Sequence, residues 1–370
     1  MAIFKTLVTK IPIPNDKKIK QKSYLQMGNL AIIDQGLSFI GGYTNDTSYQ
    51  LDFDLPVIVF GDHTCCVKYL TFPFAAGADG IKVLKPCINV LPKYLYYGTQ
   101  YLVLCLPDRG YARHYQHIEK MELPVPPIEE QQRIVTRIEE LFSELDSAVE
   151  TLQKTRQQLE VYRQAVLKEA FAECQSTVKV NDVCKHVTDG DHMPPPKAET
   201  GIPFIMISNI DKNVINWNGT AFVNREYYEN INDKRRPQKG DVLYTVTGSF
   251  GIPVLVDFDR EFCFQRHIAL LRPNNRIIQK YLYYVMQEPE VYQQAEKKST
   301  GTAQKTVSLS VLRNIEIPFV ESVKEQERIV EKIESQLSVC DGIEKTIEES
   351  LQQAEAMRQS ILKKAFEGRL

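Results

Sequence analysis

A long internal repeat is the feature that most constrains how this chain can fold. The segment "EEQQRIVTRIEELFSELDSAVETLQKTRQQLEVYRQAVLKEAF" ends at Phe171, and it aligns without a gap with "KEQERIVEKIESQLSVCDGIEKTIEESLQQAEAMRQSILKKAF", which ends at Phe366. Roughly 19 of 44 positions are identical when the alignment starts at Ile128 and Val323. The pentapeptide "KYLYY" also occurs twice, at Lys93 and at Lys280. The repeat predicts a tandem of two half-proteins, each a larger globular domain followed by a helical segment.

Both repeated segments carry apolar residues at alternating steps of four and three. A 3.5-residue period over more than about four heptads is typical of a coiled-coil seam. Neither segment contains proline, so each should form one helix of about 45 residues. We expect the two helices to pair antiparallel within one chain; homodimerisation through each helix is the alternative. The predicted seam residues are Ile134, Ile138, Leu141, Leu145, Leu152, Leu159, Tyr162, Ile329, Ile333, Ile343, Ile347, Met357 and Ile361.

The repeat divides the chain at residues 122, 173 and 320. We predict a first globular domain over 1–122, a helical segment over 123–173, a second globular domain over 174–320 and a second helical segment over 321–370. Short β-branched runs such as "LPVIVFGD" and "HIALLRP", bounded by Gly, Pro, Asp or Asn, indicate strands. One helix is expected in "LPKYLYYGTQYLVLCLP" and one in "IIQKYLYYVMQEPEVYQQAEKK". The globular domains are therefore α/β (α+β), with the "KYLYY" tyrosines packed against a sheet rather than stacked on bases.

Composition fits a cytoplasmic protein. No apolar run approaches the ~18 residues of a membrane helix, and the N-terminus lacks a cleavable signal. The eight cysteines have no C-x-x-C spacing, which favours reduced thiols over zinc or disulfides. The formal net charge of −2 hides an alternation, because the globular domains are slightly basic and the helical segments acidic.

Several kinds of catalytic machinery are missing from the sequence. There is no G-x-x-x-x-G-K-[ST] phosphate loop, and no Gly-rich loop in the context that a methyltransferase needs. "GDHT" at Gly61 and "GDHM" at Gly190 pair Asp with His, but they are out of register in the repeat and fit turns better than a metal or hydrolase site. We predict no catalytic and no metal site. Two basic domains on a rigid spacer could instead read two DNA half-sites, which should differ because the domains differ.

The helical segments and their flanks resemble a known family. "ELPVPPIEEQQRIVTRIEELFSELD" with "VYRQAVLKEAF", and "EIPFVESVKEQERIVEKIESQLSVCD" with "MRQSILKKAFEGRL", resemble the two spacer regions of the specificity (S) subunit, HsdS, of Type I restriction-modification systems. "QRHIALLRP" and "STGTAQKTVSLSVLRNIEIP" are similar to the closing part of that family's target recognition domains. The second junction departs from the pattern, since "PFVESVKEQ" replaces the Pro-rich stretch of the first, and we expect it to differ slightly.

The resemblance implies a non-catalytic subunit for DNA recognition, DNA methylation and phage defence. It would bind double-stranded DNA and two adenine-N6 methyltransferase (M) subunits, and it would join the restriction (R) subunits. No cofactor would be bound by this chain; S-adenosylmethionine, ATP and Mg²⁺ would belong to those partners. The competing classes are a coiled-coil structural adaptor with two protein-binding heads and a free-standing enzyme.

Phosphate contacts would position such a chain, and side chains able to form two hydrogen bonds would read base edges in the major groove. Our candidates lie near predicted loops. They are Lys20, Lys22, Tyr43, Asn45, His63 and Thr64 in the first domain, and Lys234, Arg235, Thr247, Ser249, Arg266, Thr302, Gln304 and Lys305 in the second.

Overall fold

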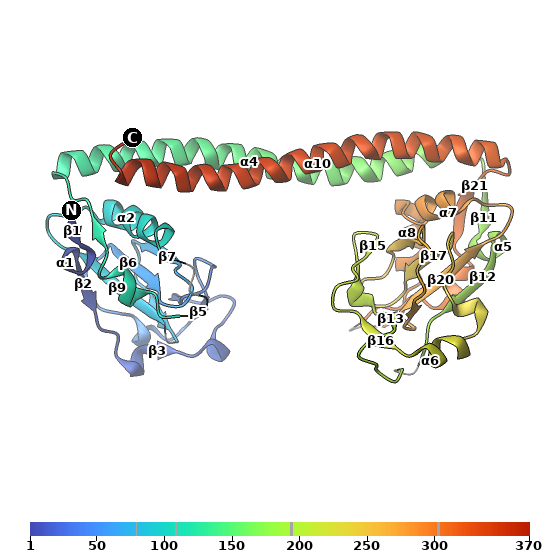
Figure 1. Cartoon of the computed structure of the whole chain (residues 1–370), viewed down its shortest axis with the longest axis horizontal. Coiled ribbons are helices and arrows are strands. Elements are labelled where there is room, and N and C mark those ends of the chain that lie inside the picture. Colours follow the sequence, from blue (N-terminus) through green and yellow to red (C-terminus); the bar gives the residue numbers. More distant parts are fainter. Residues whose placement is uncertain (79, 108–109, 111, 193–194, 302–303) are drawn as a thin grey trace. The chain divides into compact units, whose positions relative to one another are not determined.

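The computed structural model describes residues 1–78, 80–107, 110, 112–192, 195–301 and 304–370 (Figure 1). The chain forms two compact units, of which only the second is one continuous segment of sequence. Unit 1 combines Met1–Gln153 with Glu348–Leu370, and unit 2 is Lys154–Ile347. Each unit therefore contains one globular domain and parts of both long helices. No helix among the described residues is long and apolar enough to cross a membrane.

The globular domain of unit 1 is built on an antiparallel four-stranded sheet. Of its two inner strands, β6 (Val57–Gly61) is buried over its whole length: Ile58 and Phe60 pack in the core shared with the helices, and Val57 and Val59 pack in the core on the opposite side. A smaller mixed sheet and a short strand pair complete the domain. The first sheet has the order β2 (Val8–Ile11), β9 (Ile81–Pro86), β6 (Val57–Gly61), β7 (Val67–Leu70); the second β3 (Lys18–Ile19), β8 (Ala75–Gly77), β4 (Leu30–Ile33), β5 (Gly42–Thr44); the pair is β1 (Ala2–Ile3) with β10 (Glu122–Leu123). The helices are α1 (Phe4–Leu7), α2 (Pro92–Leu104), α3 (Tyr115–Ile118) and the 3-10 turns η1 (Asn15–Lys17), η2 (Gln21–Ser23) and η3 (Thr47–Tyr49).

The globular domain of unit 2 repeats this plan. It has a four-stranded antiparallel sheet, a three-stranded sheet and two strand pairs, one of which joins the two ends of the domain. The order of the first sheet is β12 (Cys184–Asp189), β20 (Ile268–Pro273), β17 (Val242–Thr245), β18 (Pro253–Leu255); of the second β16 (Ala221–Val223), β13 (Ile202–Ile205), β19 (Cys263–Phe264); the pairs are β11 (Ser176–Lys179) with β21 (Glu316–Phe319) and β14 (Ile210–Asp211) with β15 (Val214–Ile215). The helices are α5 (Val180–Val183), α6 (Arg225–Asn230), α7 (Gln279–Val285), α8 (Pro289–Lys297), α9 (Leu309–Arg313) and the 3-10 turns η4 (Ile207–Asn209) and η5 (Asp233–Arg235). The predicted α+β class is confirmed.

The helix predicted over "IIQKYLYYVMQEPEVYQQAEKK" is wrong as a single element. It is two helices, α7 and α8, separated at Met286–Glu288. Pro289 disfavours helical backbone at the residue before it, and Glu288 accordingly has ψ of 134°. Its buried carboxylate accepts the backbone N–H groups of Glu290 and Val291, so the break becomes a capped helix start.

The "KYLYY" tyrosines lie on α2 and α7, as predicted, but several of them contact the long helices. Tyr94 is fully buried with its ring centroid 5.0 Å from that of Phe366, and Tyr281 likewise lies 5.3 Å from Phe171. Tyr96 points the other way, toward Tyr69 of β7 at 5.6 Å. Each of these helices is therefore sandwiched between its sheet and the long helices.

The long helices are α4 (Ile128–Ala172) and α10 (Val323–Phe366), and they run antiparallel within each unit (Figure 1). In unit 1, Arg358 pairs with Asp146, and its guanidinium lies 4.8 Å from the ring centroid of Phe142. In unit 2, Arg163 pairs with Asp341 at 2.6 Å, and Lys332 with Glu169 at 3.2 Å. The predicted antiparallel helix pair is confirmed.

The seam residues differ in burial along these helices. Tyr162, Ile343 and Met357 are 50%, 40% and 54% exposed, because an α-helix has 3.6 rather than 3.5 residues per turn and a strict heptad seam drifts across it. Leu141 and Leu152 are half-buried, and the remaining seam residues are buried: Ile134, Ile138, Leu145, Leu159, Ile329, Ile333, Ile347 and Ile361. Val135 and Leu167 lie outside the predicted seam yet are buried, since the ends of α4 also pack on the globular domains.

Candidate nucleic-acid interface

Three of the predicted residues of the second globular domain line one cavity of about 350 Å³. Thr247 follows β17, Arg266 precedes β20, and Gln304 lies in the segment before α9. Gly248, with φ of +69°, forms the turn that brings these segments together, and its backbone N–H donates to Lys305 at 2.9 Å. The cavity thus combines a hydroxyl, a guanidinium and a side-chain amide, which are groups that read base edges.

Asp189, at the end of β12, lines the same cavity and was not predicted. Its carboxylate accepts from His192 at 2.8 Å and from Arg235 at 3.3 Å. A carboxylate next to exposed donors can accept a hydrogen bond from an amino group of cytosine. Only the folded sheet brings Asp189 next to Arg266, so the local sequence carries no signal for it.

Lys234 and Arg235 lie on η5 beside a second cavity of about 560 Å³. Tyr227 also lines it, and its hydroxyl donates to Asp191 at 2.7 Å. Burial and the neighbouring carboxylate raise the pKa of Tyr227, so the phenol stays protonated as a donor. The basic loop "DKRRP" is therefore placed at the edge of a polar hollow.

Ser249 and Lys305, also predicted in this domain, are not among the residues that line the cavity of about 350 Å³. Ser249 is exposed in the turn after Gly248. Lys305 forms an ion pair of 3.2 Å with Glu296 of α8. Thr302 lies outside the described residues.

In the first globular domain, the predicted residues fall into two groups. Lys20 and Lys22 are exposed at η2, and Tyr43 is half-buried on β5, where its backbone pairs with Leu25 at 2.9 Å. Asn45 is exposed, and its side-chain oxygen accepts the backbone N–H of Asn29 at 3.2 Å. Of this group, the two lysines offer charge to a partner, while Tyr43 and Asn45 also hold the small sheet together.

His63 and Thr64 form the second group, in the turn between β6 and β7. The hydroxyl of Thr64 donates to the carbonyl oxygen of Gln35 at 2.5 Å, and the backbone N–H of His63 donates to the side chain of the same residue at 3.3 Å. The His63 ring contacts the carbonyl oxygen of Ala112 at 3.1 Å. These hydrogen bonds hold the turn against the loop after β4 and so fix the position of His63.

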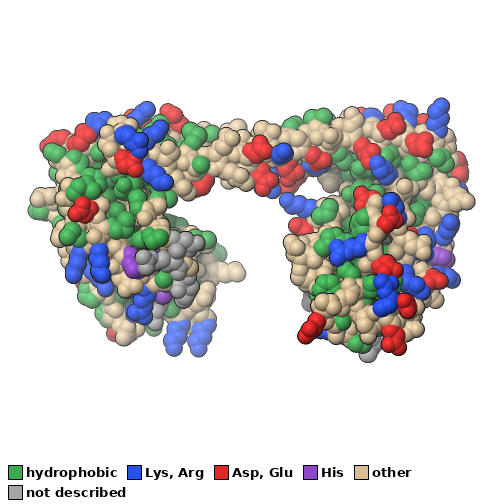
Figure 2. Space-filling view, in the orientation of Figure 1, with side chains coloured by type: hydrophobic (Ala, Val, Ile, Leu, Met, Phe, Trp, Pro, Cys, Tyr) green, Lys and Arg blue, Asp and Glu red, His purple; other side chains and the backbone are tan. Residues whose placement is uncertain are grey.

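His63 lines a cavity of about 450 Å³ whose basic residues were missed by sequence reasoning. Lys10 and Lys82 come from β2 and β9, and Arg113 from the loop before α3. Burial opposes ionisation of Asp62 in this cavity, but the Tyr115 backbone N–H and Lys82, at 3.2 Å, outweigh it and hold the Asp62 pKa below its ordinary value. On the face seen in Figure 2, this domain shows more Lys and Arg than acidic side chains on the side away from α4 and α10. Such a concave basic surface suits phosphates.

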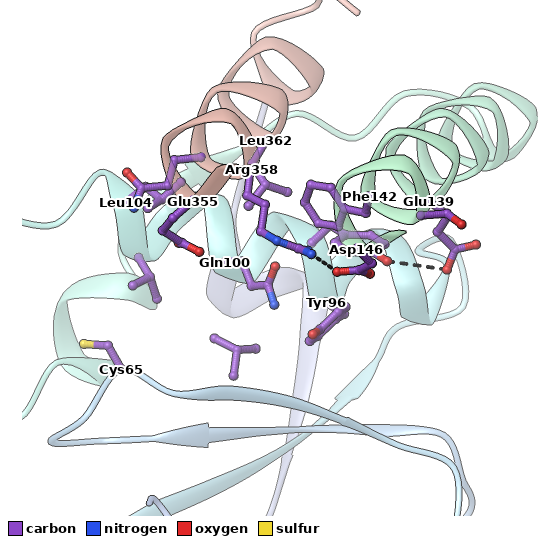
Figure 3. Close-up of a pocket in the computed structure, with 15 residues that line it drawn as sticks. Cys65, Tyr96, Gln100, Leu104, Glu139, Phe142, Asp146, Glu355, Arg358 and Leu362 are labelled. Atoms are coloured by element: carbon purple, nitrogen blue, oxygen red, sulfur yellow. Dashed lines mark hydrogen bonds and ion pairs between the residues drawn. The ribbon is translucent and has the colours of Figure 1, made fainter. Parts of the chain in front are cut away.

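A different cavity, of about 650 Å³, lies in unit 1 between α2 and the long helices (Figure 3). Tyr96 and Gln100 of α2 face it, Glu139 and Asp146 contribute from α4, and Arg358 from α10. Its wall is mixed acidic and apolar, which suits a protein partner rather than DNA. Among the described residues, no cluster of His, Cys, Asp and Glu could hold a metal ion.

Comparison with known proteins identifies the family of this chain. Residues 8–161 and 175–353 match the family described as the Type I restriction modification DNA specificity domain. The EcoBI specificity subunit of Escherichia coli is 27% identical over 278 residues, which are 67% of this chain and 58% of that protein. The chain thus spans little more than half of that relative. The EcoR124I/EcoR124II specificity subunit of Escherichia coli is 24% identical, with 95% of this chain and 91% of that protein covered.

Two solved structures share the fold. A chain from a study of complex assembly and conformational transition of the type I R-M system has a TM-score of 0.67 at 16% identity, covering 100% of this chain and 97% of its own. The HsdS subunit of Thermoanaerobacter tengcongensis has a TM-score of 0.51 at 16% identity, with coverages of 100% and 96%.

Proposed function

This chain belongs to the family of Type I restriction modification DNA specificity domains, and on that premise we propose that it is the DNA sequence-specificity subunit of a Type I restriction-modification complex. One observation carries the proposal. Each unit presents a polar, partly basic face of loops on its globular domain, and each fixes that domain to a pair of long helices. Such a chain recognises DNA and leaves the chemistry to its partners.

The target is bipartite and asymmetric. The two globular domains share one strand plan but line their cavities with different side chains: Arg266, Gln304 and Asp189 in the second, and Lys10, Lys82 and Arg113 in the first. Different donors and acceptors select different base edges. The two half-sites therefore differ in sequence and are separated by base pairs that the chain does not read.

The long helices recruit the catalytic partners. Two adenine-N6 methyltransferase subunits bind them, with the mixed cavity between α2, α4 and α10 as part of that surface in unit 1. The restriction subunits join this assembly in the cytoplasm. S-adenosylmethionine, ATP and Mg²⁺ are bound by these partners, and this chain itself is not an enzyme.

Adenine methylation mapping tests the proposal. DNA from a strain expressing this chain with its methyltransferase partner is compared with DNA from the same strain lacking the chain. We expect a split motif that requires the chain, and we expect replacement of residues 1–122 by the matching domain of a relative to change one half of the motif only. Methylation that does not depend on the chain, although the complex forms, would overturn the proposal and favour the structural adaptor.

A further inference from the structure

Gln131 ties three segments of unit 1 together at the point where the globular domain meets α4. Its side chain is fully buried. Its oxygen accepts the backbone N–H of Leu91 at 2.9 Å, and its nitrogen donates to the carbonyl oxygens of Asn89 at 3.0 Å and Pro126 at 2.9 Å. Both amide donors and the amide acceptor are thus used. One planar group holds the start of α2, the loop before it and the residues that lead into α4.

Gln326 makes the same three hydrogen bonds in unit 2. It is also fully buried; its oxygen accepts from Ile278 at 2.9 Å, and its nitrogen donates to Arg276 at 2.7 Å and Val320 at 2.8 Å. The sequences that lead into the two helices differ, since "PVPP" stands before α4 and "PFVE" before α10. The expected difference between the two junctions therefore does not extend to these bonds.

A second pair of contacts braces each junction. Tyr94 donates to the carbonyl oxygen of Pro124 at 3.0 Å, and Tyr281 donates to that of Pro318 at 3.2 Å. Further along the helices, Lys93 pairs with Glu139 at 2.5 Å, and Lys280 with Glu334 at 2.7 Å. The exposed ion pairs contribute little, whereas an unpaired buried amide is costly. Rotation of the globular domain against its helix would break the hydrogen bonds of the buried glutamine, and this loss would cost more free energy than the loss of the exposed ion pair.

We propose that Gln131 and Gln326 are positioning residues that fix the orientation of each globular domain on its helix and thereby set the number of unread base pairs between the half-sites. The idea rests on the proposed function. One added base pair shifts a half-site by ~3.4 Å and rotates it by about 35° around the duplex. Only a stiff junction penalises that displacement, so loss of the glutamine bonds relaxes the choice of gap length.

The test uses the full chain in its complex with the methyltransferase partner. Methylation rates are measured on the mapped target and on targets whose gap is one base pair longer or shorter. Gln131→Met keeps the side-chain length but removes the amide, and Gln132→Met is the matched control, because Gln132 is its exposed neighbour. We expect Gln131→Met to reduce discrimination against the altered gaps about tenfold, equivalent to ~1.4 kcal/mol, while the control leaves it unchanged.

The alternative outcomes are separable. An unchanged gap preference in Gln131→Met, or a loss of methylation that is equal at all gap lengths, would overturn the positioning role. A wild-type complex that methylates no split motif would overturn the proposed function, and the spacing role with it. If Gln131→Met does not fold, Gln131→Glu takes its place, because the carboxylate still accepts from Leu91 but faces two carbonyl oxygens without a donor; it must show the same relaxed gap preference.

Discussion

At the scale of single residues, Arg266 combines exposure, positive charge and a place on the cavity of the second globular domain. Its backbone N–H donates to Asp191 at 3.0 Å, which fixes the start of the side chain. A guanidinium placed in this way can donate two hydrogen bonds to a guanine or to a phosphate. We expect Arg266→Ala to weaken binding of the complex to its target about tenfold. Fluorescence anisotropy measures this, with Lys324→Ala on α10 as a control that removes equal charge; an equal loss in both variants would contradict the assignment.

Asp62 gives the first globular domain a pH-dependent stability. Burial raises its pKa, but the backbone N–H of Tyr115 at 3.0 Å and Lys82 outweigh burial and hold the pKa below 3.8. A carboxyl whose pKa is lower in the folded state contributes stability above its ordinary pKa, and that contribution is lost as the pH falls through 3.8 and below. We expect Asp62→Asn to lower the free energy of unfolding by about 1 kcal/mol near pH 7, and by much less near pH 3. Urea unfolding at both pH values decides this, and an equal cost at both would refute it.

At the scale of elements, the sequence was informative where one period or one residue type dominated. The heptad period predicted α4 and α10, and the β-branched runs predicted β6 and β20. The break before Pro289 was missed, because the apolar pattern continues through it and hides the cap formed by Glu288. Lys82 and Asp189 were missed for another reason: strand pairing, which local patterns do not encode, brings them to their cavities.

Gly342 lowers the stability of α10, and the structure has room for a larger residue at this position. It lies inside the helix, and a Cβ added there would meet no atom within 4 Å other than those of the neighbouring residues and of the helix's own backbone. Ser147 occupies the equivalent position of α4. We expect Gly342→Ala to raise the free energy of unfolding of the isolated chain by about 0.5–1 kcal/mol, because alanine loses less backbone entropy in a helix.

Gly368 is the matched comparison for that substitution. It follows the end of α10 with φ of +71°, where a Cβ is strained although space is open. Gly368→Ala should therefore give no gain in a thermal unfolding experiment, and a gain equal to that of Gly342→Ala would show that backbone conformation does not govern the effect.

At the scale of the whole molecule, the N-terminal domain is completed by the end of α10, a segment that is distant in sequence. Phe366, near the C-terminal end of α10, stacks on Tyr101 at 5.3 Å and contacts Tyr94, so it belongs to the core of the N-terminal domain. Phe171, at the end of α4, belongs instead to the core of the second domain. A substitution at the C-terminal end of α10 should consequently destabilise the first globular domain, and one at the C-terminal end of α4 should destabilise the second.

Two alanine substitutions test which domain each of these phenylalanines stabilises. Phe366→Ala should destabilise unit 1 by about 3–5 kcal/mol and raise hydrogen exchange in α2, whereas Phe171→Ala should do so in unit 2 and α7. Peptide-resolved hydrogen exchange of the full chain measures both, because it reports each helix separately. Both phenylalanines are almost fully buried, so the two variants are matched in chemistry and differ in place. If Phe366→Ala raised exchange in α7 and left α2 protected, each half would be folding with its own helix, and the pairing of Glu348–Leu370 with the N-terminal domain would be wrong.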